Sequence, residues 1–178
     1  PQILSDDKIN QKGQRIFYTY TAIPQSIGAD SIPYITIMQV NKVLTKEPVF
    51  VEDNDAKDYG TDPIEISGQS ISKAHLNLRY TFLNGGNHLI PHSISLLIAK
   101  DAQPDARGYL SAELRHDAAD DLQLNANSGY VSFTLENMPG FKEGTLKGFK
   151  IKTKTIKNET DIVEVTMNNN RKSMNFNI

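Results

Sequence analysis

The segment HLNLRYTF, residues 75–82, alternates strictly between polar and apolar side chains. Leu76, Leu78, Tyr80 and Phe82 fall on one face, and the polar side chains between them fall on the other. A half-buried antiparallel strand requires this division, because one face of its sheet meets the core and the other meets water. The segment therefore predicts a β-strand that lies over an apolar core.

Similar segments follow it at short and regular spacing. Gly85-Gly86 supplies positive φ at no steric cost and predicts a hairpin turn to the next strand. The other alternating segments are residues 94–98, 109–114, 130–136, 149–154 and 163–167. Strands of this number and spacing are typical of a sandwich or a barrel. We predict one antiparallel β-sandwich over residues 64–167, with a core of Leu76, Leu78, Tyr80, Phe82, Leu96, Leu110, Leu114, Val131, Phe133, Leu135, Ile151, Val163 and Val165.

The segment at residues 149–154 carries three lysines on its polar face, Lys150, Lys152 and Lys154. Lysines on a strand hinder edge-to-edge aggregation, so this pattern predicts an edge strand. Residues 157–159 predict a turn to the segment that follows.

The first sixty residues have a different pattern. Residues 15–21 and 34–43 predict two strands that pair in antiparallel fashion across a loop rich in Pro, Ser, Gly and Asp. Residues 58–63, DYGTDP, contain many residues that break strands. We place a domain boundary there, between an N-terminal domain at residues 1–62 and a C-terminal domain at residues 63–178.

Two strands, or three if residues 2–4 contribute, cannot bury a core alone. Either they dock on the larger domain, or they belong to a small barrel whose other strands lie upstream. Residues 1–7 have no basic region and no apolar stretch, so they are not a signal peptide, and the chain lacks an initiator methionine. We expect a processed or truncated form whose export signal, if any, lies upstream. No long helix is predicted, although residues 118–122 could form one turn.

The composition excludes several classes of protein. The 178 residues include 19 basic and 21 acidic side chains, a net charge of −2, which argues against a nucleic-acid partner. The chain has no cysteine, so it has no disulfide, no thiolate metal site and no cysteine nucleophile. A typical apolar run, residues 96–99, is far too short to span a bilayer.

The four histidines include His88 and His92, which flank Leu89-Ile90-Pro91. On a helix this spacing would place two zinc ligands on one face. Pro91 and the strand context disfavour a helix, so we interpret both as surface or turn residues. We expect no metal and no cofactor.

The densest polar run is residues 115–121, RHDAADD. A carboxylate beside His116 could orient a general base, and the clustered aspartates, including Asp120 and Asp121, could bind calcium. The alternative is that Arg115, His116 and Asp117 have structural roles, with Asp117 accepting backbone N–H bonds in a turn that Arg115 ties down. We favour this alternative.

The alternation places His116 on the face of Leu114 and Ser111 on the opposite face, so Ser111 is a poor nucleophile for His116. We predict no catalytic residue in this run. His116→Ala is then expected to lower stability by about 0.5–2 kcal/mol without abolishing any ligand binding.

Other patterns carry less information. The sequence contains neither a phosphate-binding loop nor a Gly-x-Ser-x-Gly elbow. The lysines of residues 142–157 are balanced by acidic residues and indicate a solvated strand face. Asn158-Glu159-Thr160 fits the glycosylation acceptor pattern, which often occurs by chance.

Two blocks of sequence resemble a known family. The first is GYLSAELRHDA at residues 108–118 with SGYVSF at residues 128–133, and the second is VLTK at 43–46, GTDPI at 60–64 and LNL at 76–78. They resemble the NigD-like proteins, a group regarded as cell-envelope lipoproteins of Bacteroidales. The resemblance implies an N-terminal OB-like barrel followed by a C-terminal β-sandwich, and export with a lipid anchor upstream of Pro1. It implies no activity.

Three functions remain open from the sequence. The first is a non-catalytic envelope protein, in the periplasm or on the outer membrane of a Gram-negative bacterium, that binds another envelope protein or a glycan. The second is a hydrolase using carboxylates such as Asp117, Asp120 or Asp121, for which a deep pocket joining two carboxylates is the test. The third, which rests on the family name, is an accessory or immunity protein for a bacteriocin.

Overall fold

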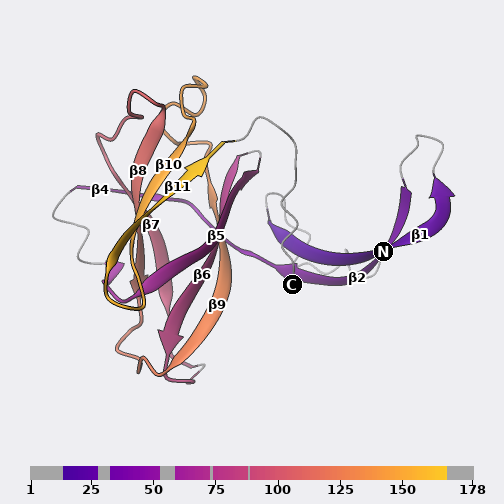
Figure 1. The fold of residues 1–178 in the computed structure, drawn as a ribbon, viewed down its shortest axis with the longest axis horizontal. Coiled ribbons are helices and arrows are strands. Elements are labelled where there is room, and N and C mark those ends of the chain that lie inside the picture. The colour runs from indigo at the N-terminus through magenta and orange to yellow at the C-terminus, as the bar shows by residue number, and fades with distance from the viewer. Residues whose placement is uncertain (1–13, 28–32, 53–58, 73, 88, 168–178) are drawn as a thin grey trace. The chain divides into compact units, whose positions relative to one another are not determined.

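The computed structural model describes residues 14–27, 33–52, 59–72, 74–87 and 89–167, and these residues contain strands and no α-helix (Figure 1). The expectation of an all-β chain is confirmed. The chain divides into two compact units, residues 1–45 and 46–178.

The first unit contains a two-stranded antiparallel ribbon. Strand β1 (Ile16–Ile27) pairs with β2 (Pro33–Lys42), with Ile16 opposite Lys42 and Ala22 opposite Ile35. The predicted pairing of residues 14–21 with 34–44 is confirmed. The OB-like barrel around this ribbon stays a prediction. Residues 1–13, which include the possible strand at residues 2–4, lie outside the described residues.

The β-sandwich consists of two sheets packed face to face (Figure 1). The four-stranded sheet has the order β3 (Leu44–Lys46), β9 (Asn125–Thr134), β6 (His75–Asn84), β5 (Ile64–Ser72). The five-stranded sheet has the order β11 (Thr160–Thr166), β10 (Gly148–Lys154), β8 (Tyr109–Asp117), β7 (Ser93–Ala99), β4 (Val49–Val51). The second sheet is mixed, because β10 runs parallel to β8 and β4 runs parallel to β7.

The core lies between the two sheets and contains the residues predicted from the alternation. All the predicted core residues are buried except Phe82 and Val163, which are partly buried and pack against the core. The register predicted for these strands is therefore confirmed, since a slip of one residue would have turned each set toward solvent.

The sandwich unit begins earlier than the boundary expected at residue 63. It starts at Lys46, because Val49 and Val51 of β4 pair with Leu97 and Ala99 of β7. The described part of the DYGTDP segment is a loop held within this unit, where the Asp62 N–H donates to the carbonyl of His116 at 3.0 Å. The turn-forming residues of this segment therefore indicate a loop within a domain and not the boundary between two domains.

The predicted hairpin at Gly85-Gly86 is wrong. Strand β6 pairs with β5 and β9, whereas β7 pairs with β8 and β4, so this connection crosses from one sheet to the other. The glycines meet two other requirements: Gly86 has a φ of 83°, and a Cβ on Gly85 would lie 2.6 Å from Oδ1 of Asp121. Local turn chemistry does not specify which sheet receives the next strand.

The prediction that residues 149–154 form an edge strand is also wrong. Strand β10 lies between β8 and β11, and β11 forms the edge. The lysines of β10 pair with carboxylates, with Lys150 Nζ 2.7 Å from Asp105 and Lys152 Nζ 3.4 Å from Glu113. The turn predicted at residues 157–159 is confirmed and joins β10 to β11, with Asn158 at a φ of 63°.

The two-sheet core predicts a sharp contrast between two substitutions. Phe133 is fully buried, so Phe133→Ala should lower the free energy of unfolding by about 3–5 kcal/mol through lost burial and a new cavity. Ile162 on the edge strand is 61% exposed, so Ile162→Ala should change stability by less than about 0.5 kcal/mol. Urea denaturation of both variants measures the two losses, and losses of equal size would contradict the described packing.

Candidate functional site

The polar run at residues 115–121 lies at one end of the sandwich. Strand β8 continues to Asp117, and the alternation along it places His116 inside and Ser111 on the exposed face. Only 1% of His116 is exposed. The predicted orientations of His116 and Ser111 are confirmed.

The residues on either side of His116 contact the backbone of nearby loops. Arg115 Nη1 donates to the carbonyl of Gly60 at 3.2 Å, and Asp117 Oδ1 accepts the N–H of Ala119 at 2.9 Å. Asp62 Oδ2 accepts the N–H of Ala118 at 2.8 Å. These contacts agree with the sequence prediction that Arg115 ties down a loop and that Asp117 caps a turn.

A continuous chain of hydrogen bonds passes through two histidines to a carboxylate. His116 Nδ1 lies 3.1 Å from the carbonyl oxygen of Pro63, and His116 Nε2 lies 2.9 Å from His92 Nδ1. His92 Nε2 lies 3.1 Å from Asp121 Oδ2. All four ring nitrogens are therefore engaged, and none is free to take a proton from a substrate.

Burial and aromatic packing surround this chain. The ring of Phe82 lies edge-on to both imidazoles, with centroids 5.2 Å from His92 and 5.5 Å from His116. The side chain of Asp121 is 3% exposed and that of His92 is 12% exposed. Only the edge of His92 reaches solvent, so the hydrogen bonds operate in an almost dry site where an unpaired polar group is costly.

Asp121 is held as a carboxylate mainly by the backbone. The N–H of Gly85 donates to Oδ2 at 2.8 Å and lowers the pKa of Asp121, burial opposes this shift, and hydrogen bonds from His92 and the Leu122 N–H add to it. Because Gly85 follows β6 and Asp121 follows β8, the carboxylate joins the ends of strands from both sheets.

His116 is held neutral by its surroundings. Burial lowers the pKa of His116, the bond to the Pro63 carbonyl opposes this shift, and proximity to His92 lowers it further. A carbonyl oxygen can only accept, so neutral His116 carries its proton on Nδ1 and accepts from His92 at Nε2.

The turn that positions Asp121 has an unusual backbone. Ala119 and Asp120 have φ values of 50° and 61°, and the Asp121 N–H donates to the Ala118 carbonyl at 3.0 Å. Two positive φ values in succession are the pattern of a type I′ turn, which non-glycine residues rarely adopt. The helical turn expected at residues 118–122 is therefore wrong, because this turn winds with the opposite hand.

The described residues do not form the metal sites considered from the sequence. Within the described ranges, no group of three or more histidine and acidic side chains could hold a metal ion. His92 faces His116 and Asp121, and His88 lies outside the described residues. The expectation that the protein needs no metal stays a prediction.

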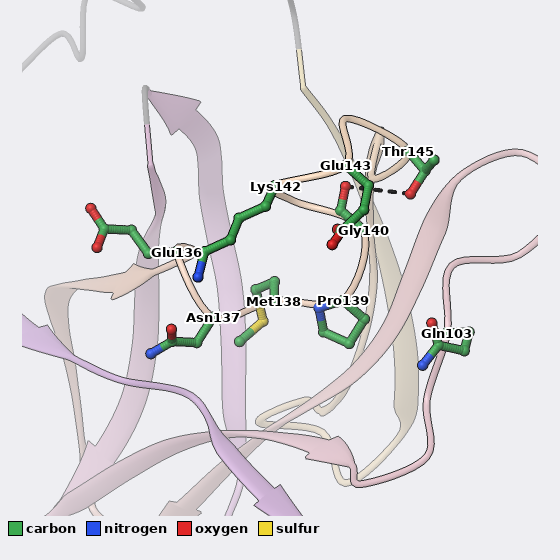
Figure 2. Close-up of a pocket in the computed structure, with 9 residues that line it drawn as sticks. All are labelled: Gln103, Glu136, Asn137, Met138, Pro139, Gly140, Lys142, Glu143 and Thr145. Atoms are coloured by element: carbon green, nitrogen blue, oxygen red, sulfur yellow. Dashed lines mark hydrogen bonds between the residues drawn. The ribbon is translucent and has the colours of Figure 1, made fainter.

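Two open depressions lie on the sandwich, and the smaller one is lined in part by Arg115 of the polar run and Asp62 of its loop. The larger, with a volume of about 640 Å³, is lined by the loop of residues 136–145 together with Gln103 (Figure 2). The smaller, about 260 Å³, is lined by both acidic and basic side chains, including Glu113, Arg115 and Lys152. Asp117, Asp120 and Asp121, the carboxylates considered for hydrolysis, line neither of these depressions.

A family model describes most of the sandwich unit. The "NigD-like C-terminal beta sandwich domain" matches residues 47–167, which is more than half of the 178-residue chain. The chain belongs to the NigD-like family. The resemblance inferred from residues 108–118 and 128–133 is thereby confirmed. Among proteins with curated descriptions, none matches this NigD-like chain.

Solved structures share the fold. A protein of unknown function, DUF1344, from Bacteroides vulgatus matches with a TM-score of 0.73 at 20% identity, over 93% of this chain and 76% of that one. A "NigD-like immunity protein" from Bacteroides caccae matches with a TM-score of 0.62 at 16% identity, over 84% and 71% of the two chains. A "Putative lipoprotein" from Bacteroides fragilis matches with a TM-score of 0.56 at 12% identity, over 84% and 80%.

The search for membrane-spanning helices gave a negative result. Of the residues that the structure describes, none form a helix with the length and apolar character needed to cross a bilayer.

The burial of His116 predicts that its substitution lowers stability by more than the sequence alone predicted. His116→Ala should lower the free energy of unfolding by about 2–4 kcal/mol, because it leaves a cavity, an unpaired carbonyl and an unpaired His92 nitrogen. Thermal and urea denaturation measure the loss. A variant as stable as the wild type would contradict the described burial.

The lowered pKa of His116 predicts acid destabilisation. Above its ordinary pKa of 6.5, His116 is neutral in both the folded and the unfolded chain. As the pH falls below 6.5, the unfolded chain takes up a proton that the folded chain resists until its lower pKa is reached, so stability is lost over this interval. Urea midpoints from pH 6.5 downward should fall for the wild type and for the control His75→Gln, but less steeply for His116→Gln. Equal slopes in all three proteins would contradict the assignment.

Proposed function

We propose that this protein is a non-catalytic, lipid-anchored component of the bacterial cell envelope that binds another envelope protein or a surface glycan. The observation that carries the proposal is that most of the candidate catalytic groups form hydrogen bonds within the protein. Of the carboxylates considered for hydrolysis, Asp117 and Asp121 accept backbone N–H bonds and Asp120 lies exposed outside both depressions, and both ring nitrogens of His92 and of His116 are engaged. A general base needs a nitrogen or carboxylate oxygen open to substrate.

The fold class supports a binding function. All-β sandwiches present loops at their two ends and commonly use them for recognition, although a fold alone assigns no function. A similar structure from Bacteroides fragilis is described as a "Putative lipoprotein", which supports the proposed anchor in the envelope. A lipid anchor upstream of Pro1 would tether the sandwich at a membrane surface.

Fractionation of cells tests the proposed location. The full-length gene with its own leader, expressed in the native host, should yield a protein that stays in the membrane fraction through a high-salt wash. Replacing the upstream cysteine that carries the lipid should release it. Recovery of the wild-type protein from the cytoplasm would contradict the proposal.

Enzyme assays test the absence of catalysis. The purified chain should bind, and leave intact, envelope glycans presented on an array or envelope proteins captured by cross-linking. Asp117→Asn and Asp120→Asn serve as a pair, because Asp117 caps a backbone N–H and Asp120 lies exposed in the same turn. A hydrolytic activity that either substitution abolishes in a folded protein would overturn the proposal in favour of a carboxylate-based hydrolase.

A second candidate function is an accessory role in bacteriocin immunity or production. The observation that favours it is the likeness to a structure described as a "NigD-like immunity protein". Deletion of the gene should then raise the sensitivity of the host to a bacteriocin, and restoring the gene should reverse this. Unchanged sensitivity to the bacteriocins of neighbouring strains would leave the binding function as the better account.

A further inference from the structure

The chain from Pro63 to Asp121 contains three hydrogen bonds and ends in an acceptor on both sides. The Pro63 carbonyl can only accept, and so can an ionised Asp121. His116 must therefore donate from Nδ1 and His92 must donate from Nε2, and one further proton must lie between the two rings. The three bonds need three protons on four ring nitrogens. Two neutral imidazoles carry only two.

We propose that the His92–His116 pair is a proton-binding site, and that the single proton it holds beyond the neutral state lies between the two rings and locks His92, the residue before β7, against His116 near the end of β8. The bound proton gives the pair one positive charge, which the carboxylate of Asp121 neutralises. The inference concerns a conformational device within the sandwich and does not depend on the proposed binding function.

The surroundings indicate which ring carries the charge. Burial lowers the pKa of His116 and the Gly85 N–H lowers that of Asp121, so His116 is neutral and Asp121 is ionised at neutral pH. The remaining arrangement is an imidazolium at His92, donating from Nδ1 to His116 and from Nε2 to Asp121. This arrangement satisfies every polar atom in the chain, as an almost dry site requires.

The charged groups around the pair come from several elements. Asp62, in the loop before β5, and Asp117, at the end of β8, favour a positive charge on His116, and Asp121 follows β8. From β3, Lys46 donates to the carbonyl of Ile94, the residue of β7 that pairs with His116. From β6 the neighbour is the uncharged ring of Phe82. On the outer side of the loop before β5, Arg115 and Lys154 donate to the carbonyls of Gly60 and Thr61, and Asp121 is the charged group in hydrogen-bond contact with the pair.

Loss of the proton would break the lock. His92 would keep the Nε2 proton that it donates to Asp121, and its bare Nδ1 would face the bare Nε2 of His116 at 2.9 Å in a site with little exposure to solvent. These two acceptors repel each other, so the contact between the two rings would open. The bonds to Asp121 from His92 Nε2 and from the Gly85 N–H would remain.

The loops after β6 and β8 carry exposed apolar side chains. Leu89 is 90% exposed and Leu122 is 64% exposed. The β-carbon of Leu122 lies beside Gly85, so the two loops meet at the surface above the buried pair. The proton therefore controls how firmly His92, which follows the loop that carries Leu89, is held.

Histidine NMR tests the proposal directly. The full chain, labelled with ¹⁵N at histidine, is measured by long-range ¹H–¹⁵N correlation, which distinguishes protonated from bare ring nitrogens. At about pH 7.5, about one unit above the ordinary pKa of histidine, His92 should show two protonated nitrogens and His116 one. Two neutral rings at this pH would overturn the proposal.

A matched pair of variants tests whether Asp121 is the counter-ion of the protonated histidine pair. Asp121→Asn and Asp120→Asn remove the same charge from neighbouring positions, and only Asp121 contacts His92. At about pH 7.5, Asp121→Asn should lose the second protonated nitrogen of His92, because no carboxylate neutralises the charge, whereas Asp120→Asn should match the wild type. Equal behaviour of the two variants would overturn the proposal.

If Asp121→Asn fails to fold, amide hydrogen exchange of the wild-type protein still tests the proposal. Raising the pH until the pair loses this proton should accelerate hydrogen exchange at the N–H groups of Leu89, Ile90 and His92, beyond the intrinsic dependence of exchange on pH. The edge strand β11 supplies the reference amides. An unchanged ratio between these two sets as the proton is lost would overturn the lock.

Discussion

The structure depends on the exclusion of water between two sheets that each have one apolar face. Neither sheet is stable alone, because its buried face would be solvated, so both form only together. This requirement fixes the register of every long strand of the sandwich, since a slip of one residue would put Leu76, Phe133 or Ile151 into water. It also explains the short β4, which adds apolar residues to the edge of β7 although it pairs through only three positions.

The polar chain from Pro63 to Asp121 closes one end of this core. Strands from both sheets end there, and backbone groups at strand ends have no ladder partner. His116 binds the Pro63 carbonyl before β5, and Asp121 binds the N–H of Gly85 after β6. The two histidines and Asp121 thus link the ends of four strands, β5, β6, β7 and β8, and the buried charge of Asp121 must be balanced locally. A site arranged in this way is suited to holding loops in position.

Alternation predicted the strands, their faces and the orientation of His116, because inward and outward positions are set by residue spacing alone. The turn from β10 to β11 was predicted, but the connection after β6 was not, since the turn at Gly85-Gly86 carries no information about which sheet receives the next strand. The histidine pair was missed for a similar reason. The sequence placed His92 with His88 and Asp121 with Asp120, whereas the pairing of β7 with β8, with Ile94 opposite His116, brings His92 and His116 together. The positive φ values at Ala119 and Asp120 had no sequence signal, because neither residue is glycine.

The central claim is that one proton beyond the neutral pair completes the hydrogen-bond chain at the end of the sandwich. Neutron diffraction from a crystal grown in deuterated solvent at neutral pH measures this most directly, because it locates deuterons on nitrogen and oxygen. The account predicts deuterons on Nδ1 and Nε2 of His92 and on Nδ1 of His116, with none on Nε2 of His116 or on the Asp121 carboxylate. Two deuterons on the four ring nitrogens, or a deuteron on Asp121, would contradict it.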